Sequence, residues 1–339
     1  MKKYFYIALA AAALTSCNSD EAIEMVEKRA IGFDNVFVNN ATRATDLNED
    51  NITEFGVYAS VSANNTQGMI LTNERVYKPE GKTAFGYDNI QYWIASAQYD
   101  FTAIAPYQEG TNATWAYSTT DAKNGTIEFD NAIAKADQDL LFAYKQPAKT
   151  AAAITSQPDA VAFDFSHILS RVQFTFVNTI STASNIELVV SDVKITDAYK
   201  KGTIEVANGA ITSNYWTVSG TNNSFDIAFA NNGAEIKGDN GTETTAHHYM
   251  IPVNKEYNVY FKVKLLQAGA NLGTYERTAT VNLDLKKGMS YNVKAYLSTD
   301  NVLPNALYPI EFKINEVGKW DDYSDVDAND PYGEPASNY

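Results

Sequence analysis

Apolar residues recur at every second position through much of this 339-residue chain, and this alternation limits the possible folds more than any other feature. The clearest runs are residues 55–61, 172–176, 259–265 and 281–285. Successive side chains of a strand point to opposite faces, so each run predicts a half-buried strand. Four Asn-Gly pairs lie between such runs and favour tight turns. The pattern therefore predicts an all-β protein of antiparallel β-sandwiches.

No Pro-rich or Ser-rich linker divides these strands, and the best candidate boundary is the polar segment NTISTASN at residues 178–185. We therefore expect one β-sandwich domain at residues 44–182 and a second at residues 186–320. Residues 321–339 contain six acidic residues and neither Lys nor Arg, which predicts a mobile acidic tail.

The composition disfavours several classes of function. Acidic residues outnumber basic ones by 41 to 26, and the net charge of −15 disfavours a nucleic acid as partner, because such binding relies on Lys and Arg. The sequence lacks a nucleophile elbow, a zinc-protease motif, a phosphate loop and a dinucleotide fingerprint. The adjacent His247 and His248 are expected on opposite faces of a strand, which suits no chelate. We therefore expect no enzyme, no metal site and no cofactor.

Residues 1–17 have the features of an export signal. Two Lys residues precede eleven uncharged, mostly apolar residues, too few to span a bilayer. The signal ends in Leu14-Thr15-Ser16-Cys17, which resembles the bacterial lipobox, and Cys17 is the only cysteine. The resemblance implies cleavage before Cys17, acylation (palmitate among the acyl chains) and an outer-membrane anchor. The alternative is a plain signal peptide with a coincidental cysteine.

Further motifs follow one another along the chain. They are IGF at residues 31–33, ATRAT at 41–45, FGVYA at 55–59, YW at 92–93, YDFTAIAPY at 99–107, DLL at 139–141, FDFSHILSR at 163–171 and YMIP at 249–252. Together they resemble the fimbrillin family, the subunits of type V pili of Gram-negative anaerobes. The resemblance covers essentially the whole chain. It implies two tandem transthyretin-like β-sandwich domains and a structural role in a fimbrium, with adhesion and colonisation as its purpose.

The resemblance also implies a use for residues 18–43, the expected pro-segment. ATRAT is similar to the family's processing loop, so we predict that an Arg-specific protease cuts after Arg43. Polar residues flank this site, as is usual for loops that proteases cut. Arg29 is the runner-up, although a cut there leaves the apolar segment 31–38, with Ile31 and Phe33, attached to the body.

Loss of segment 31–38 is expected to expose a ladder of unpaired backbone groups beside an apolar groove. A replacement strand must present apolar side chains at every second position. Tyr308, Ile310, Phe312 and Ile314 meet this requirement and form our candidate donor strand. The alternative is that residues 307–317 are the last strand of their own domain.

These features favour a structural pilin subunit at the cell surface. We expect it to be exported as a lipoprotein and polymerised by protease-triggered strand exchange, with copies of itself or with other pilin subunits. The alternative is a monomeric surface lipoprotein that binds glycans. Exposure of Trp115 or Trp216 on a concave face would favour that alternative.

Overall fold

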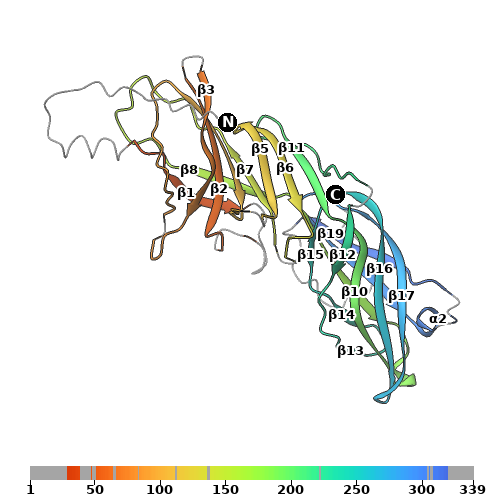
Figure 1. The fold of residues 1–339 in the computed structure, drawn as a ribbon. Coiled ribbons are helices and arrows are strands. Elements are labelled where there is room, and N and C mark those ends of the chain that lie inside the picture. The colour runs from red at the N-terminus through yellow and green to blue at the C-terminus, as the bar shows by residue number, and fades with distance from the viewer. Residues whose placement is uncertain are drawn as a thin grey trace, which may run out of the picture.

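The computed structural model describes residues 29–319, apart from residues 39–46, 48–50, 64–65, 83, 111–112, 136–137, 221–222, 304 and 306–307. These residues form an elongated, all-β molecule, which confirms the all-β part of the prediction (Figure 1). In the part of the chain so described, no helix has the length and apolar composition needed to cross a membrane.

A six-stranded sheet lies at one end of the molecule (Figure 1). Its strands, in spatial order, are β1 (Phe33–Val38), β8 (Val161–His167), β7 (Leu141–Lys145), β4 (Gln98–Ala105), β2 (Glu54–Ala63) and β3 (Thr66–Tyr77). Neighbouring strands are antiparallel except for β1, which is parallel to β8. Alternate residues such as Phe55, Val57 and Phe101 are fully buried, as the sequence pattern predicts.

The opposite face of β2 and β4 is buried as well, so the expectation of one solvated face is wrong here. A three-stranded sheet of β5 (Trp115–Asp121), β6 (Asn124–Asp130) and β11 (Lys201–Val206) covers this face. The rings of Tyr58 and Tyr117 meet edge to face at 5.0 Å, and the Ala122 amide donates to Ser60 Oγ at 3.2 Å. Polar and aromatic residues of β2 thus pack against a second sheet.

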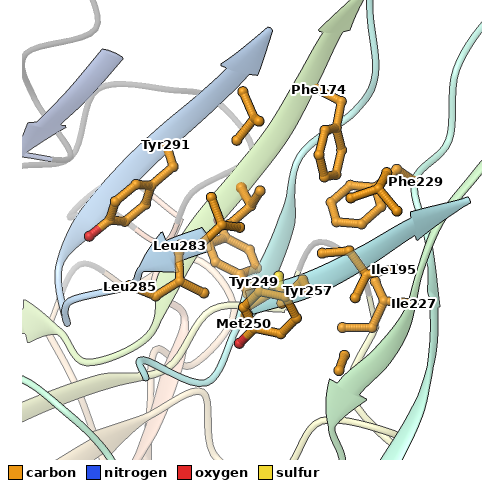
Figure 2. Packing of buried hydrophobic residues seen from close by; sticks show 14 of the residues in the cluster. Phe174, Ile195, Ile227, Phe229, Tyr249, Met250, Tyr257, Leu283, Leu285 and Tyr291 are labelled. Atoms are coloured by element: carbon orange, nitrogen blue, oxygen red, sulfur yellow. The ribbon is translucent and has the colours of Figure 1, made fainter. Parts of the chain in front are cut away.

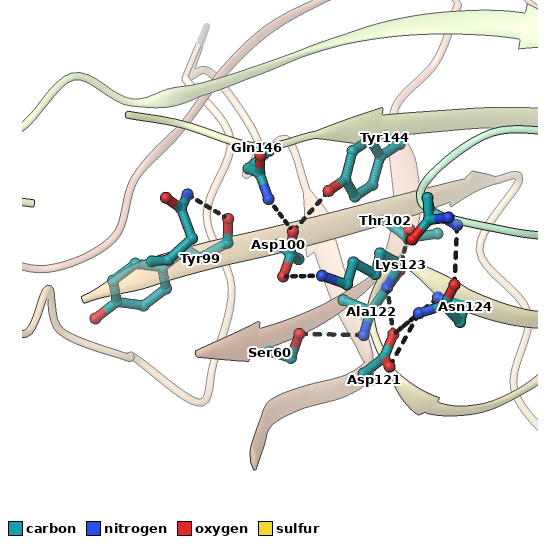
Figure 3. A network of polar contacts seen from close by, with 12 residues as sticks. Ser60, Tyr99, Asp100, Thr102, Asp121, Ala122, Lys123, Asn124, Tyr144 and Gln146 are labelled. Carbon is teal, nitrogen blue, oxygen red and sulfur yellow. Dashed lines mark hydrogen bonds and ion pairs between the residues drawn. The ribbon is translucent and has the colours of Figure 1, made fainter. Parts of the chain in front are cut away.

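Buried Asp100 on β4 is the centre of a polar network behind this sheet (Figure 3). Its carboxylate accepts hydrogen bonds from the Tyr144 hydroxyl at 2.6 Å and from Gln146 Nε2 at 2.7 Å. Lys123 Nζ lies 4.0 Å from the same carboxylate. Burial, together with this carboxylate, raises the pKa of Tyr144, so its hydroxyl remains a donor. The network joins the β5–β6 turn to β4 and to β7.

Two further sheets pack face to face at the other end of the molecule (Figure 1). One contains β14 (Gly241–Thr244), β9 (Ser170–Asn178), β18 (Met289–Leu297) and β19 (Phe312–Lys319), with β15 (His248–Met250) also paired to β9. The other contains β12 (Ser224–Ala228), β10 (Ile186–Tyr199), β16 (Asn254–Gln267) and β17 (Ala270–Asp284), with β13 (Glu235–Ile236) also paired to β10.

The apolar faces of these two sheets form one core (Figure 2). Phe174 on β9 meets Phe229 edge to face at 4.9 Å, and Phe176 meets Phe261 on β16 at 5.0 Å. The predicted alternation on β16 is confirmed, because Phe261 is fully buried whereas Lys262 is only half-buried. Contrary to the expected antiparallel order, β9 and β18 are parallel. The long chain between them runs through the facing sheet, and such a crossover permits parallel pairing.

The expected boundary segment contains η1 (Thr182–Ser184), a short 3₁₀ helix. The sheets, however, do not divide there. β9 was expected in the first domain but pairs with β18, because its Phe side chains belong to the second core. β11 was expected in the second domain but pairs along its whole length with β6. β9 and β11, on either side of the expected boundary, therefore each pair with a strand from the other half of the chain.

Candidate strand-exchange site

The predicted removable segment is the edge strand β1 together with the residues before it. Ile31, Phe33 and Val36 are buried, with exposures of 1%, 4% and 3%, whereas Phe37 is 51% exposed. The pairing with β8 shifts register between Phe33 and Val36. This irregularity acts like a β-bulge, because it returns Val36 to the buried face after one additional residue.

Phe33 provides the main apolar contact of this segment. Its ring lies 5.1 Å from Tyr87, 6.0 Å from Phe163 and 6.3 Å from Phe101. Burying such a side chain contributes about 1.5–3 kcal/mol, and each aromatic pair about 0.5–1.5 kcal/mol more. Removal of the segment would therefore leave an apolar groove with an aromatic floor beside the unpaired edge of β8.

The two predicted cleavage sites differ in what the structure describes. Arg43 lies outside the described residues, as does the predicted lipidation site Cys17. Arg29 is described and exposed, but its carbonyl oxygen accepts a hydrogen bond from the Trp93 amide at 2.9 Å. A protease could reach the Arg29 peptide bond only after this backbone had left its partner.

The candidate donor residues lie at the other end of the molecule. In the single chain, β19 pairs antiparallel with β18 as the last strand of its sheet. Phe312 packs against Phe174 at 5.5 Å and Phe261 at 6.0 Å. Ile310 is 8% exposed, but Ile314 is 40% and Tyr308 is 64% exposed. The four side chains do not share one buried face, because Ile310 is buried and Phe312 is partly buried, whereas Tyr308 and Ile314 are exposed.

The described tryptophans are core residues. Trp93, Trp115 and Trp216 are buried, and the last two donate through Nε1 to the Pro106 and Ile168 carbonyl oxygens, each at 2.8 Å. Trp320 lies outside the described residues. The exposure that would have favoured the glycan-binding alternative is therefore not observed at Trp115 or Trp216.

Two of the described histidines, His167 and His248, are likewise buried within the fold. His167 Nδ1 lies 2.6 Å from Asp139 Oδ2, and both side chains are buried. His248 is also buried, with its Nδ1 2.7 Å from the Tyr249 carbonyl oxygen. Across the described ranges, no group of three or more His, Cys, Asp or Glu side chains is arranged to hold a metal ion.

Sequence reasoning missed the residues that hold the start of the segment. The Tyr87 hydroxyl donates to the Ile31 carbonyl oxygen at 2.9 Å, and Gln157 Nε2 donates to the Ala30 carbonyl oxygen at 2.7 Å. These partners are 56 and 127 residues apart in the chain. No local pattern in one sequence connects positions so distant.

A family model described as "Fimbrillin-like" matches residues 42–316, which is most of the chain. The chain belongs to the fimbrillin-like family. This confirms the family predicted from the sequence motifs, and it is a family of fimbrial structural proteins rather than enzymes. A second model, for the lipid attachment site of prokaryotic membrane lipoproteins, matches residues 1–18, which include Cys17.

This fimbrillin-like chain is similar to several solved structures, and the first of the two named here shares its fold. A fimbrial protein from Bacteroides vulgatus ATCC 8482 is 18% identical, with a TM-score of 0.62 and coverage of 86% of this chain and 99% of that chain. The fimbrial anchor protein Mfa2 from Porphyromonas gingivalis is 10% identical, with a TM-score of 0.39 and coverage of 85% and 97%. No curated protein matches the chain.

Proposed function

We propose that this fimbrillin-like protein is a structural subunit of a cell-surface fimbria, polymerised when a protease releases its N-terminal strand. The observation that carries the proposal is the position of β1, an edge strand whose segment buries Ile31, Phe33 and Val36 and which precedes the predicted processing loop. The match of residues 1–18 to the lipid attachment site model supports lipidation at Cys17, export as a lipoprotein and anchoring of the precursor in the outer membrane. Adhesion and colonisation are the role proposed for the assembled fimbria.

In this proposal, an Arg-specific protease cuts after Arg43. The resulting loss of β1 leaves backbone groups of β8 unpaired beside an aromatic groove. A strand from another pilin subunit pairs with that edge and fills the groove. Such a contact joins two different surfaces, so it propagates head to tail into an open polymer. Arg29 is the weaker candidate, because its carbonyl group is bonded to Trp93.

The proposed donor comprises Tyr308, Ile310, Phe312 and Ile314. Within the described part of the chain, β19 is an edge strand paired with β18 alone, so fewer backbone hydrogen bonds hold it than hold an internal strand. The exposed apolar surface of Tyr308 and Ile314 is available to a groove on another subunit. Release of the donor requires Phe312 to leave its aromatic contacts.

The proposal includes two tandem transthyretin-like domains, preceded by the pro-segment at residues 18–43 and followed by the acidic tail at residues 321–339. The pairing of β9 with β18 and of β11 with β6 supports a domain boundary that follows the sheets rather than the polar segment at residues 178–185.

N-terminal mass spectrometry of filaments sheared from cells tests the proposal. We expect polymerised subunits to begin at Ala44, and we expect Arg43→Gln cells to accumulate unpolymerised precursor. Arg29→Gln is the matched control and should assemble normally. Filament subunits that begin at Ala30 or Cys17 would refute processing at Arg43.

A further inference from the structure

Residues 29–33 and residues 36–38 of the N-terminal segment differ in the number of neighbouring segments that bind their backbone. Residues 29–33, which we call the clamped segment, have partners on both sides. On one side, the Ile31 amide donates to the Gln91 carbonyl oxygen at 2.8 Å, and Ala30 forms an antiparallel bridge with Tyr92. On the other side, the Val161 amide donates to the Gly32 carbonyl oxygen at 2.8 Å. The backbone of this segment is therefore internal, although β1 itself is an edge strand.

Among the described strands, residues 36–38 have one neighbour only. Their register partners Phe163, Asp164 and Phe165 all belong to β8, and the other side of the strand is the free edge of the sheet. Phe37, in the middle of this stretch, is 51% exposed. The end of the segment nearest Arg43 is therefore the end with fewer bonds.

Tyr87 connects the clamped segment to the body through both its hydroxyl and its ring. The hydroxyl donates to the Ile31 carbonyl oxygen at 2.9 Å and accepts from the Gln91 amide at 3.0 Å. The ring meets Phe33 at 5.1 Å, and the side chain is 8% exposed. Burial raises the pKa of Tyr87, so the hydroxyl remains protonated near neutral pH. Gln157 adds a second side-chain bond from the opposite flank, to the Ala30 carbonyl oxygen.

We propose that the clamped segment keeps the N-terminal fragment bound after the chain is cut at Arg43, and that Tyr87 is a positioning residue that sets how long it stays. This inference rests on the proposed function, since it concerns release of the same strand. Dissociation then begins at residues 36–38 and ends when the bonds of residues 29–33 break. An incoming strand from a second subunit gains its first contacts beside Phe165, at the end of β8 that is vacated first.

Residue-resolved amide exchange in the uncut, full-length lipoprotein in detergent tests the clamp without any proteolysis. We expect the Ile31 amide to exchange more slowly than the amides of residues 36–38. Tyr87→Phe keeps the ring against Phe33 but removes one hydrogen bond to the segment. It should accelerate exchange at Ile31 roughly three- to tenfold, as loss of one net hydrogen bond predicts, and leave residues 36–38 unchanged.

Two further variants make this measurement specific. Tyr77→Phe is the matched control, because the Tyr77 hydroxyl donates to Asp88 at 3.1 Å and not to the segment, and it should leave Ile31 exchange unchanged. Gln157→Ala changes a surface contact that does not threaten folding, and it should accelerate exchange in the same direction as Tyr87→Phe. Equal exchange at residue 31 and at residues 36–38, or no response to Tyr87→Phe and Gln157→Ala, would overturn the clamp.

Cutting the same lipoprotein with an Arg-specific protease tests retention directly. We expect the fragment that ends at Arg43 to co-elute with the body in size-exclusion chromatography and to dissociate three- to tenfold faster from Tyr87→Phe. Immediate loss of the fragment from the unsubstituted protein would refute retention. If subunits that have lost the fragment fail to polymerise, that result counts against the proposed function. It does not affect the conclusion from amide exchange.

Discussion

The indole Nε1 of Trp216 donates a hydrogen bond to the carbonyl oxygen of Ile168 at 2.8 Å, at the point where β8 passes into β9. The indole ring also meets Phe129 of β6 at 6.2 Å. A residue of the long connection after β11 thus contacts both the strand crossover and the small sheet. This places Trp216 at the junction between the two halves of the molecule.

Substitution of Trp216 should therefore destabilise the whole fold. Trp216→Phe leaves the buried Ile168 carbonyl group without its donor and should lower the free energy of unfolding by about 1–3 kcal/mol. Trp216→Ala should lower it by about 3–5 kcal/mol. Urea unfolding measures both changes. Tyr215→Phe is the control at the neighbouring position. Because Tyr215 is exposed, removal of its hydroxyl should change the free energy of unfolding by less than about 1 kcal/mol. A change below 1 kcal/mol in Trp216→Ala would contradict a junction role.

Substitutions of Phe33, which is buried, and of Phe37, which is exposed, test how the N-terminal strand is held. Phe33→Ala should lower the free energy of unfolding by about 3 kcal/mol, because the side chain is buried among aromatic rings. Phe37→Ala, at 51% exposure, should change it by less than about 0.5 kcal/mol. Phe33→Ala should also accelerate proteolysis of the segment. Similar values for the two variants would show that the strand is not held through its buried face.

Substitutions of Phe312 and Ile314 distinguish the two possible roles of β19, as the last strand of its own domain and as the donor strand to another subunit. Phe312→Ala should destabilise the isolated subunit by roughly 2–4 kcal/mol, because the ring contacts Phe174 and Phe261. Ile314→Ala should have little effect on the isolated subunit, since its side chain is 40% exposed, but should weaken assembly if it enters another subunit's groove. Thermal unfolding and filament yield are the two measurements. Normal assembly of Ile314→Ala would argue against its use in the donor.

A larger deletion tests the same strand. Removal of residues 305–339 should stop assembly if β19 is the donor. If the subunit stays folded, the segment acts mainly between subunits. If the second half unfolds, as judged by circular dichroism, the segment belongs chiefly to its own core, and the donor must be another strand.

Stability should fall at alkaline pH because of buried tyrosines. Burial raises the pKa of Tyr291 and of Tyr117 to about 12 each, above the usual value near 10. Between these values the unfolded chain releases protons that the folded chain retains, so the free energy of unfolding should fall as pH rises from about 10 toward 12. Urea unfolding across this range measures the slope. Tyr291→Phe should make it shallower, and an unchanged slope would exclude this cause.

The sequence pattern was sufficient to identify several strands, among them β2, β9 and β16, and the apolar residues that these strands bury. Val259 and Phe261 on β16 and Phe174 on β9 are buried as predicted. The pattern was insufficient to identify which strands and sheets pack against one another, because alternation indicates the direction of a side chain and not what covers it. The alternation at residues 55–61 therefore placed Tyr58 on a face expected to contact solvent, although the small sheet covers this side chain.

The candidate site shows the same limit. Ile31 and Phe33 could be assigned to an apolar strand from their spacing alone, and both are buried. The register shift before Val36 and the bonds from Tyr87 and Gln157 depend on contacts between segments far apart in the chain. Such contacts leave no periodic trace in one sequence.

The pairing of β11 with β6 has a mechanical consequence. Six consecutive residues of β11, from Lys201 to Val206, are paired with residues 125–130, so the two halves share a sheet in addition to their covalent connection. A pulling force applied across the subunit is therefore distributed over a ladder of hydrogen bonds rather than concentrated in one flexible linker. In a filament of such subunits, each subunit would behave as a stiff rod, and bending would occur at the joints between rods.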